Sequence, residues 1–347
     1  MMRERPLEGS MKDVRFWMLL AALVLTILAM VLPRVKLTRD VYDLVAVVDI
    51  TGSMNTRDMT VSGKPVSRLD AAKSALERLL ASLPCQSRLG LGVFTERRSF
   101  LLFNPVEVCE NFAPLETAIQ NLDWRMAWEG DSMVAKGFYH AISIAEDLKA
   151  DLVFVTDGHE APPLPPGAGL PEFEGTPGKV MGLVLGIGGK DKVPMPKFDD
   201  DGNEIGVYGP MDVPQENHSG APPPDAHLRP GYHPKWAPFG TDVAKGEEHL
   251  SSVRSEHLAA MAAKTGLAHA DLIDTNDILD AISTHAHTRP VEVAVDIRPV
   301  PASLALALLV ALYALPRLVS LRSRFHRHSA TGRGSQGPRV GAVPLRI

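Results

Sequence analysis

The stretch Asp40–Met54, with the sequence DVYDLVAVVDITGSM, decides the fold. Its centre, Val45–Val48, is an apolar run rich in β-branched residues, which is typical of a strand buried on both faces of a parallel sheet. The run ends in a carboxylate and two hydroxyls at alternate positions, Asp49, Thr51 and Ser53. Because ligands of open α/β sheets bind beyond the carboxyl ends of the strands, these side chains are expected at a binding edge. Oxygen ligands of this kind suit a hard cation such as Mg²⁺.

Two later segments add polar side chains to the same predicted edge. Residues 151–156 form another apolar strand, which ends at Asp157. Ser132 immediately precedes an apolar helix predicted over 133–148. A doubly wound sheet, whose parallel strands end on one edge, would bring Ser132 and Asp157 to Asp49. The alternative is that Asp131 or Ser132 only caps the helix, as such residues commonly do.

The cysteines flank a predicted hairpin. Strands over 89–95 and 99–104 are joined by only three residues, so they must run antiparallel. If the turn is centred near Arg97, Cys85 and Cys109 lie opposite one another, about 5 Å apart at Cα, which a disulfide can bridge. We therefore predict one disulfide, with two free buried thiols as the alternative. Two cysteines alone do not make a structural zinc site, which needs four ligands.

The ends of the chain predict membrane anchoring. Residues 16–33 and 299–316 contain no charged residue, and each stretch spans roughly 27 Å as a helix, close to a hydrocarbon core. A cleaved signal peptide is the alternative for the first stretch. Residues 1–15 are partly basic, and residues 317–347 contain seven arginines without any acid, so both ends are predicted to be cytoplasmic. In a bacterium this places the intervening domain in the periplasm, tethered by two spans to the inner membrane.

The remaining pattern completes the predicted α/β fold. Ser67–Asp70 resembles a capping box that opens a helix. Further elements are a strand over 179–189, a helix over 247–264, a strand over 267–272 and a helix over 276–284. We predict a doubly wound, mostly parallel sheet with one antiparallel edge strand over residues 40–285, interrupted by a polar insertion at 190–246. Within it, residues 199–204 favour the turn of a small hairpin, since the frame of an EF-hand is missing.

Several functions are excluded or disfavoured by the sequence. The net charge of −5 and the pI of about 6.2 give no global footprint for nucleic acid. The glycines of residues 179–189 lack the context of a dinucleotide-binding fingerprint, and no phosphate-binding loop motif is present. The histidines are scattered without the spacing of metal ligands. His159 and Glu160 directly follow Asp157 and are the only adjacent candidates for a catalytic base.

The motif Asp49-x-Thr51-x-Ser53, together with Ser132 and Asp157, resembles the metal-ion-dependent adhesion site of von Willebrand factor A domains. In that family the first motif reads Asp-x-Ser-x-Ser, so Thr51 replaces a serine here, and Ser132 replaces a threonine. The resemblance implies a Rossmann-like fold and one divalent cation, Mg²⁺ first, with Mn²⁺ or Ca²⁺ as alternatives. It implies that Asp157 acts through water, and that a partner's Asp or Glu completes the ligand shell without catalysis.

The layout as a whole is similar to the membrane-anchored MxaL-type proteins of bacterial methanol dehydrogenase gene clusters. The shared features are the Asp49–Met54 motif, residues 55–58, the cysteine pair, Pro194–Lys197 and Asp201–Asn203. This resemblance implies a role in assembly or calcium insertion for periplasmic methanol dehydrogenase, with that enzyme or its accessory proteins as partner. The alternatives are a metal-dependent hydrolase with His159 or Glu160 as base, or a structural envelope protein linked to stress tolerance.

Overall fold

The computed structural model describes residues 14–32, 34–127, 130–165, 167, 169–218, 220–241, 246–272 and 278–330, the last sixteen by their backbone alone. The chain divides into two compact units. One unit comprises residues 40–291, and the other combines the segments on either side of it.

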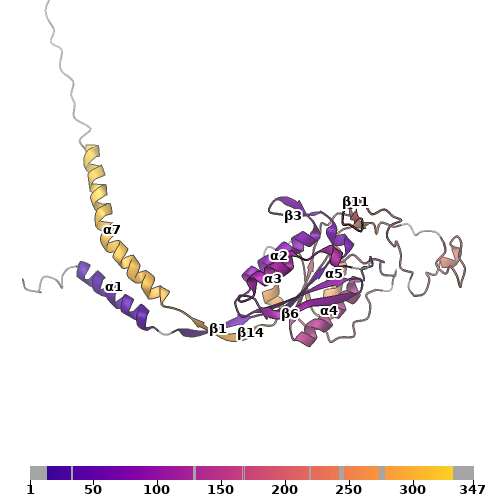
Figure 1. Ribbon diagram of the computed structural model, residues 1–347, viewed down its shortest axis with the longest axis horizontal. Helices are drawn as coiled ribbons and strands as arrows, with labels where there is room; N and C mark the ends of the chain where they lie inside the picture. The colour runs from indigo at the N-terminus through magenta and orange to yellow at the C-terminus, as the bar shows by residue number, and fades with distance from the viewer. Residues whose placement is uncertain are drawn as a thin grey trace, which may run out of the picture. The chain divides into compact units, whose positions relative to one another are not determined.

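A six-stranded sheet forms the centre of the 40–291 unit (Figure 1). Its spatial order is β13 (Ala268–Asp271), β8 (Gly182–Gly186), β7 (Asp151–Thr156), β2 (Asp43–Asp49), β5 (Arg88–Thr95) and β6 (Arg98–Glu107). All neighbouring pairs are parallel except β5 and β6, which are antiparallel. The predicted mostly parallel sheet with one antiparallel edge strand is therefore confirmed. Every residue of β2 after Asp43 is buried, as its continuous apolar run requires.

Helices cover both faces of this sheet, as in a doubly wound fold. One hydrophobic cluster joins the sheet to α2 (Arg68–Ser82), α3 (Phe112–Gln120) and α6 (Ile278–His285). A second cluster, on the other face, joins it to α4 (Val134–Leu148) and α5 (Ser255–Thr265). Helix α2 begins at the predicted N-cap, because the Ser67 hydroxyl accepts a hydrogen bond from the backbone N–H of Asp70 at 3.0 Å. The Asp70 carboxylate accepts from the same hydroxyl at 2.7 Å.

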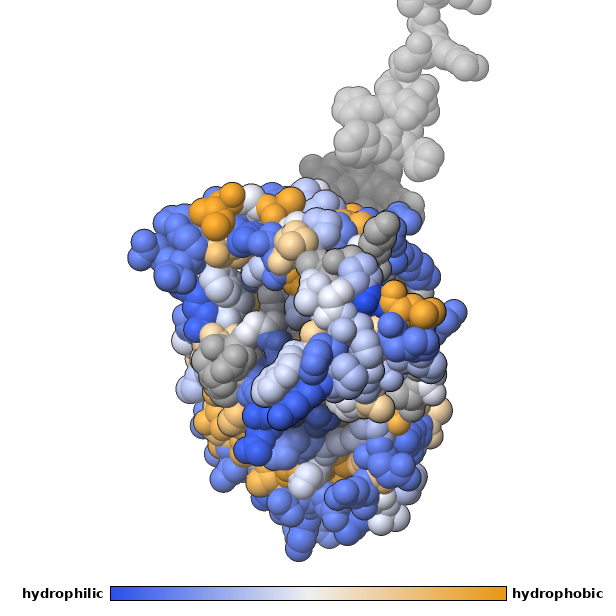
Figure 2. Space-filling view, turned by 90° about the vertical axis from the view of Figure 1, so that its right-hand side faces the viewer, coloured by the Kyte–Doolittle hydropathy of each residue, from blue (hydrophilic) through white to orange (hydrophobic). Residues whose placement is uncertain are grey.

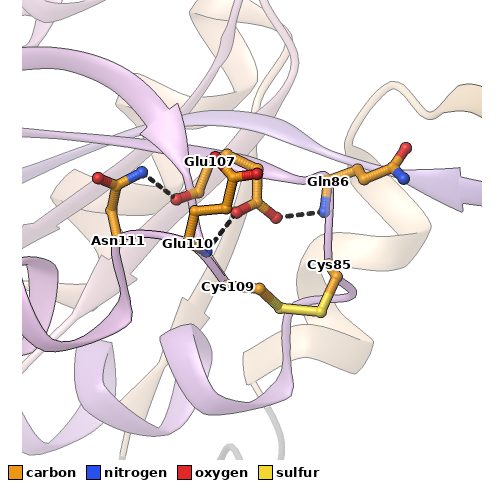
Figure 3. Close-up of a disulfide and its surroundings, with 6 residues drawn as sticks. All are labelled: Cys85, Gln86, Glu107, Cys109, Glu110 and Asn111. Atoms are coloured by element: carbon orange, nitrogen blue, oxygen red, sulfur yellow. Dashed lines mark hydrogen bonds between the residues drawn. A yellow bond between two sulfur atoms is a disulfide. The ribbon is translucent and has the colours of Figure 1, made fainter.

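The hairpin of β5 and β6 carries the predicted disulfide (Figure 3). Residues 95 and 98 pair across the turn, and the Cα atoms of Cys85 and Cys109 lie 5.2 Å apart. The Glu107 carboxylate accepts hydrogen bonds from the backbone N–H groups of Gln86 and Glu110, each at 2.5 Å. This carboxylate therefore joins the same two chain segments as the disulfide, and the predicted bridge is confirmed.

The helix predicted over 247–264 begins only at Ser255, so its first part was assigned wrongly. Residues 250–251 instead form β12, which pairs with β9 (Val193–Pro194) at the start of the insertion. The N–H groups of Val253 and Arg254 donate to the backbone carbonyls of Gly189 and Asp157. These two backbone N–H groups therefore form tertiary hydrogen bonds, and they do not form the intrahelical bonds of a helix that starts earlier.

The insertion contains the small hairpin that was expected. Strands β10 (Pro196–Phe198) and β11 (Glu204–Val207) pair antiparallel, and the Asp199 carboxylate holds the turn by accepting from the Asn203 N–H at 2.7 Å. The other short elements are η2 (Gly52–Asn55), β3 (Met59–Val61), β4 (Lys64–Val66), η3 (Trp124–Met126) and η4 (Ala226–Leu228).

The segments outside the sheet domain form two helices and a strand pair. Among the described helices, α1 (Val14–Val31) is long and apolar enough to cross a membrane, with a mean hydropathy of 2.3. Helix α7 (Pro299–Ala330) contains a shorter apolar part, Pro299–Ala314, so the second span stays a prediction. Strands β1 (Val35–Val41) and β14 (Arg289–Val295) pair with each other, which the sequence did not predict. Residues 1–13 and 331–347, at the two basic ends, lie outside the described residues.

Candidate metal centre

Asp49 is the last residue of β2 and is fully buried. Its Oδ1 accepts hydrogen bonds from the Thr51 N–H at 2.9 Å and from the Thr51 hydroxyl at 2.7 Å. Its Oδ2 accepts from the hydroxyl of Thr156, the last residue of β7, at 2.5 Å. The loop that follows β2 and the neighbouring parallel strand β7 therefore fix this carboxylate together. The role of Thr156 was missed in the sequence, although it directly precedes Asp157.

Thr51 and Ser53 lie beside the Asp49 carboxylate. Their hydroxyl oxygens are 3.5 Å apart, and both side chains are buried. Ser53 belongs to the short helix η2, and its hydroxyl helps to lower the pKa of Asp157. The alternation of carboxylate and hydroxyls seen in the sequence thus places three oxygen-bearing side chains in one place.

Ser132 is held at the same edge by backbone pairing on two sides. It exchanges hydrogen bonds with Ala161, at 2.6 and 2.7 Å, and the next residue donates to the Glu96 carbonyl at 2.5 Å. Its hydroxyl is buried and has no hydrogen-bond partner among the described residues. The cap of α4 is Met133, with no side-chain bond, so helix capping by Asp131 or Ser132 is wrong.

Asp157 forms a buried ion pair with Arg68, which was not anticipated. The Arg68 guanidinium donates from Nη1 to Asp157 at 2.6 Å and to Ser251 at 2.6 Å, while Nη2 donates to Asp58 at 2.6 Å. Arg68 has an exposed fraction of 0%. Its position in the sequence carried a signal, because it lies four and eight residues before Ala72 and Leu76, on the buried face of α2.

The two aspartates experience opposite electrostatic effects. Burial, and then the nearby Asp157 carboxylate, raise the pKa of Asp49 to about 7 despite the hydrogen bonds from threonine. Burial also acts to raise the pKa of Asp157, but the charge of Arg68, together with smaller contributions from His159 and Ser53, outweighs it, and the net direction is downward. Asp49 is therefore the carboxylate whose negative charge lacks a compensating cation within the protein. Both acids, which were predicted at the binding edge of the sheet, are fully buried.

A cavity of about 240 Å³ opens beside these residues. Thr51, Ser53 and Ser132 line it from the sheet edge, and residues 195, 208 and 212–214 of the insertion line it from the other side. His159 also lines the cavity, and burial lowers the pKa of its imidazole. Glu160 is engaged elsewhere, since its carboxylate accepts from the Ala135 N–H of α4 at 2.8 Å.

The donor set fits a hard divalent cation. Carboxylate and hydroxyl oxygens are the ligands that Mg²⁺ takes, usually with several waters retained. The unpartnered Ser132 hydroxyl is the observation that an added ligand would explain. Among the described residues, no group of three or more His, Cys, Asp or Glu side chains is arranged to hold a metal ion.

Comparison with known proteins identifies the domain. Residues 44–159 match the family model of the von Willebrand factor type A domain. No curated protein matches the chain. An aerotolerance-related membrane protein from Bacteroides fragilis is 15% identical, with a TM-score of 0.43, covering 70% of this chain and 97% of that one. An uncharacterized membrane spanning protein from Vibrio fischeri is 16% identical, with a TM-score of 0.25 and the same coverages.

Those structural likenesses are too weak to support an argument about this chain. The family match is independent of them, and it covers Asp49, Thr51, Ser53, Ser132 and Asp157. It also covers most of the sheet, including β7 and nearly all of β2, the strands that lead to Asp157 and Asp49. Residues 44–159 therefore belong to the von Willebrand factor type A family.

Proposed function

We propose that the chain is a membrane-tethered, metal-dependent recognition module without catalytic activity. Asp49, Thr51, Ser53 and Ser132 would hold one divalent cation, with Asp157 acting through water. Mg²⁺ is the first choice, and Mn²⁺ or Ca²⁺ would also suit these ligands. A carboxylate from a partner protein would complete the ligand shell.

The observation that carries this proposal is the convergence of five oxygen-bearing side chains on one sheet edge with a hydroxyl left unpartnered. The Thr51 hydroxyl donates a hydrogen bond to Asp49, the Ser53 hydroxyl helps to lower the pKa of Asp157, and Ser132 lines the same cavity as Thr51 and Ser53. The uncompensated charge of Asp49 supports the same assignment, because a cation favours the ionised form of a buried carboxylate.

Oxygen ligation explains why a carboxylate would be the partner group. Two aspartates and neutral hydroxyls leave a divalent cation electrophilic, and Arg68 already offsets part of the charge of Asp157. The cation would therefore keep an affinity for an additional anionic oxygen. Such a site recognises an acidic side chain and needs no catalytic base.

The finer assignment rests on resemblance to MxaL-type proteins. We propose that the partner is a periplasmic enzyme or its accessory protein, with methanol dehydrogenase as the first candidate, and that the module aids assembly or calcium insertion. Helices α1 and α7 would tether it to the inner membrane. The features shared with those proteins at residues 194–197 and 201–203 fall in and beside the hairpin of β10 and β11.

Calorimetric titration of the full-length protein in detergent with Mg²⁺, Mn²⁺ and Ca²⁺ tests the first step. The wild-type protein should bind one cation per chain, and Asp49→Asn should weaken binding by more than about 100-fold. Loss of an outer-shell partner alone typically costs about 10–100-fold in affinity. Thr156→Val removes the hydroxyl that donates to Asp49 Oδ2, and it should lower the affinity for the cation by about 10–100-fold.

The matched control is Asp43→Asn, at the opposite end of the same strand. Asp43 is ion-paired with Arg289 at 3.0 Å and does not line the cavity, so its substitution should leave cation binding unchanged. If the wild-type protein takes up none of the three cations, the five side chains only form turns, and the proposal fails.

A further inference from the structure

The insertion forms a second wall of the cavity beside the proposed cation site, which is called the metal edge below and consists of Asp49, Thr51, Ser53, Ser132 and Asp157. Met195, Tyr208, Val213 and Pro214 line it opposite the hydroxyl residues. Figure 2 looks onto the side of the domain that carries the insertion and shows hydrophobic groups scattered over a mostly hydrophilic surface. The cavity of about 240 Å³ is smaller than the roughly 300–1,000 Å³ of most small-molecule sites. It has room for one short side chain or small acid.

The charge on the insertion's wall is already neutralised. Asp212 lines the cavity, but its carboxylate accepts from Lys197 Nζ at 2.6 Å and from the Gly209 N–H at 2.7 Å. The rest of this wall is mostly apolar, with Met195, Val213 and Pro214. A ligand group that reaches the sheet edge therefore passes along an apolar surface.

His159 lines this cavity and is a buried polar side chain that the proposed cation site does not use. Its side chain is 2% exposed, and neither ring nitrogen has a hydrogen-bond partner among the described residues. The Glu248 carboxylate is 3.8 Å from Nε2, beyond hydrogen-bonding distance, and itself accepts from Arg254 at 3.2 Å. A buried polar group without a partner is costly, so a ligand that satisfies the ring would relieve that cost.

We propose that the cavity binds a carboxylate on a short apolar stem, and that an N–H of His159 binds the carboxylate oxygen that the cation leaves free. The inference rests on the proposed function, because the cation supplies the first contact. Met195, Val213 and Pro214 then contact the stem. His159 and the insertion thereby select an aliphatic carboxylate over other anions and over bulkier acids.

Two sources can supply this chemistry, an acidic side chain of a protein or a free short-chain acid. A neutral imidazole offers one N–H donor, which is enough for one carboxylate oxygen. Both sources present the same head group, but the far end of the stem joins a peptide backbone in the first source and ends in a methyl group in the second. A blocked glutamate (N-acetyl-glutamate N-methylamide) represents the first source, and butyrate represents the second.

Titration of each probe into the Mg²⁺-saturated full-length protein tests the proposal. Both the blocked glutamate and butyrate should bind more tightly than acetate, which lacks the stem. Stronger binding of the blocked glutamate assigns a side-chain source, and stronger binding of butyrate assigns a free acid. His159→Leu should lower the affinity for both probes by roughly 10-fold or more, as loss of a hydrogen bond to a charged group predicts. His159→Gln keeps an N–H donor and should retain part of the affinity.

The matched control is His249→Leu. His249 Nδ1 is also buried and unpartnered among the described residues, but His249 does not line the cavity. Its loss should leave probe binding unchanged.

Titration with Mg²⁺ alone distinguishes failure of the proposed function from failure of this inference. Absence of Mg²⁺ binding in the wild-type protein defeats the proposed function. Normal Mg²⁺ binding with either no probe binding, or equal probe binding in His159→Leu, overturns only this inference. Loss of Mg²⁺ binding in both His159 variants also overturns it, since His159 would then act on the cation.

Discussion

Replacement of Arg68 by Met should be among the most destabilising single changes at the metal edge. Arg68 is completely buried and binds Asp58, Asp157 and Ser251 through its guanidinium. Asp157 is also fully buried, and the Asp58 side chain is only 9% exposed. Methionine fills similar space without donors, so two carboxylates lose their counter-charge in a region that water does not reach.

The expected cost follows from the behaviour of buried ion pairs. Removal of one partner from such a pair typically lowers the free energy of unfolding by about 3–5 kcal/mol. Domains are stable by only about 5–15 kcal/mol, so Arg68→Met should still fold but with much of its margin lost. For a domain of this size the melting temperature should fall by roughly 6–20 °C. Thermal unfolding of the full-length protein in detergent, followed by circular dichroism, measures this shift.

Arg57→Met is the matched control, since Arg57 also forms an ion pair, with Glu204 at 2.7 Å, but is 54% exposed. Exposed pairs contribute about 0–1 kcal/mol, so this variant should melt close to the wild type. Adding Asp157→Asn to Arg68→Met should recover part of the loss, because it removes one uncompensated charge. Equal melting temperatures for the Arg57 and Arg68 variants would refute the account of a structural buried pair.

Three other predictions concern the disulfide, the neighbouring carboxylate and the topology. Replacing Cys85 and Cys109 by serine should lower the free energy of unfolding by about 3 kcal/mol on the chain-entropy view. In the wild-type protein, unfolded without reduction, thiol reagents should label neither cysteine, and labelling of both would contradict the bridge. Burial acts to raise the pKa of Glu107, but backbone N–H donors outweigh it and hold the pKa below 4.5, so its contribution is present above the unfolded-state pKa and lost as pH falls through the folded-state value. The stability difference between wild type and Glu107→Gln in urea should therefore shrink below about pH 4.5, and a constant difference would exclude this linkage. A reporter active only outside the cytoplasm should work when fused at Gly220 and stay silent at Gly337, and the reverse result would overturn the predicted orientation.

The sequence predicted those parts of the fold that depend on local features of the chain, such as hydrophobic periodicity and turn length. The run Val45–Val48 has the composition of a strand buried on both faces, and the end of that strand placed Asp49 at the binding edge. The disulfide was predictable because a tight turn near Arg97 sets the register of the whole hairpin. In each case a local rule, about periodicity or turn length, determines where distant side chains lie.

Other features depend on contacts between segments far apart in the chain. Arg68 was treated as a helix-start position, yet the partners that justify its burial are Asp58, Asp157 and Ser251, the last of them 183 residues away. The helix start at Ser255 was displaced for a similar reason, since the preceding donors pair with distant carbonyls. The insertion has no hydrophobic period, so its approach to the metal edge could not be inferred from pattern.

The buried arginine bears on what the proposed cation site would recognise. If both aspartates were uncompensated, a divalent cation would be close to neutralised by its own ligands and would attract a further carboxylate weakly. Arg68 binds Asp157 directly, at 2.6 Å, and the pKa of that acid is lowered accordingly. At the proposed site, the negative charge that faces a cation would then come chiefly from Asp49, and a bound cation would keep net positive charge toward the cavity. Arg68 is therefore expected to lower the affinity of the site for the cation and to increase the affinity of the bound cation for an incoming carboxylate. Such a balance suits a site that recognises a carboxylate better than one that stores a cation.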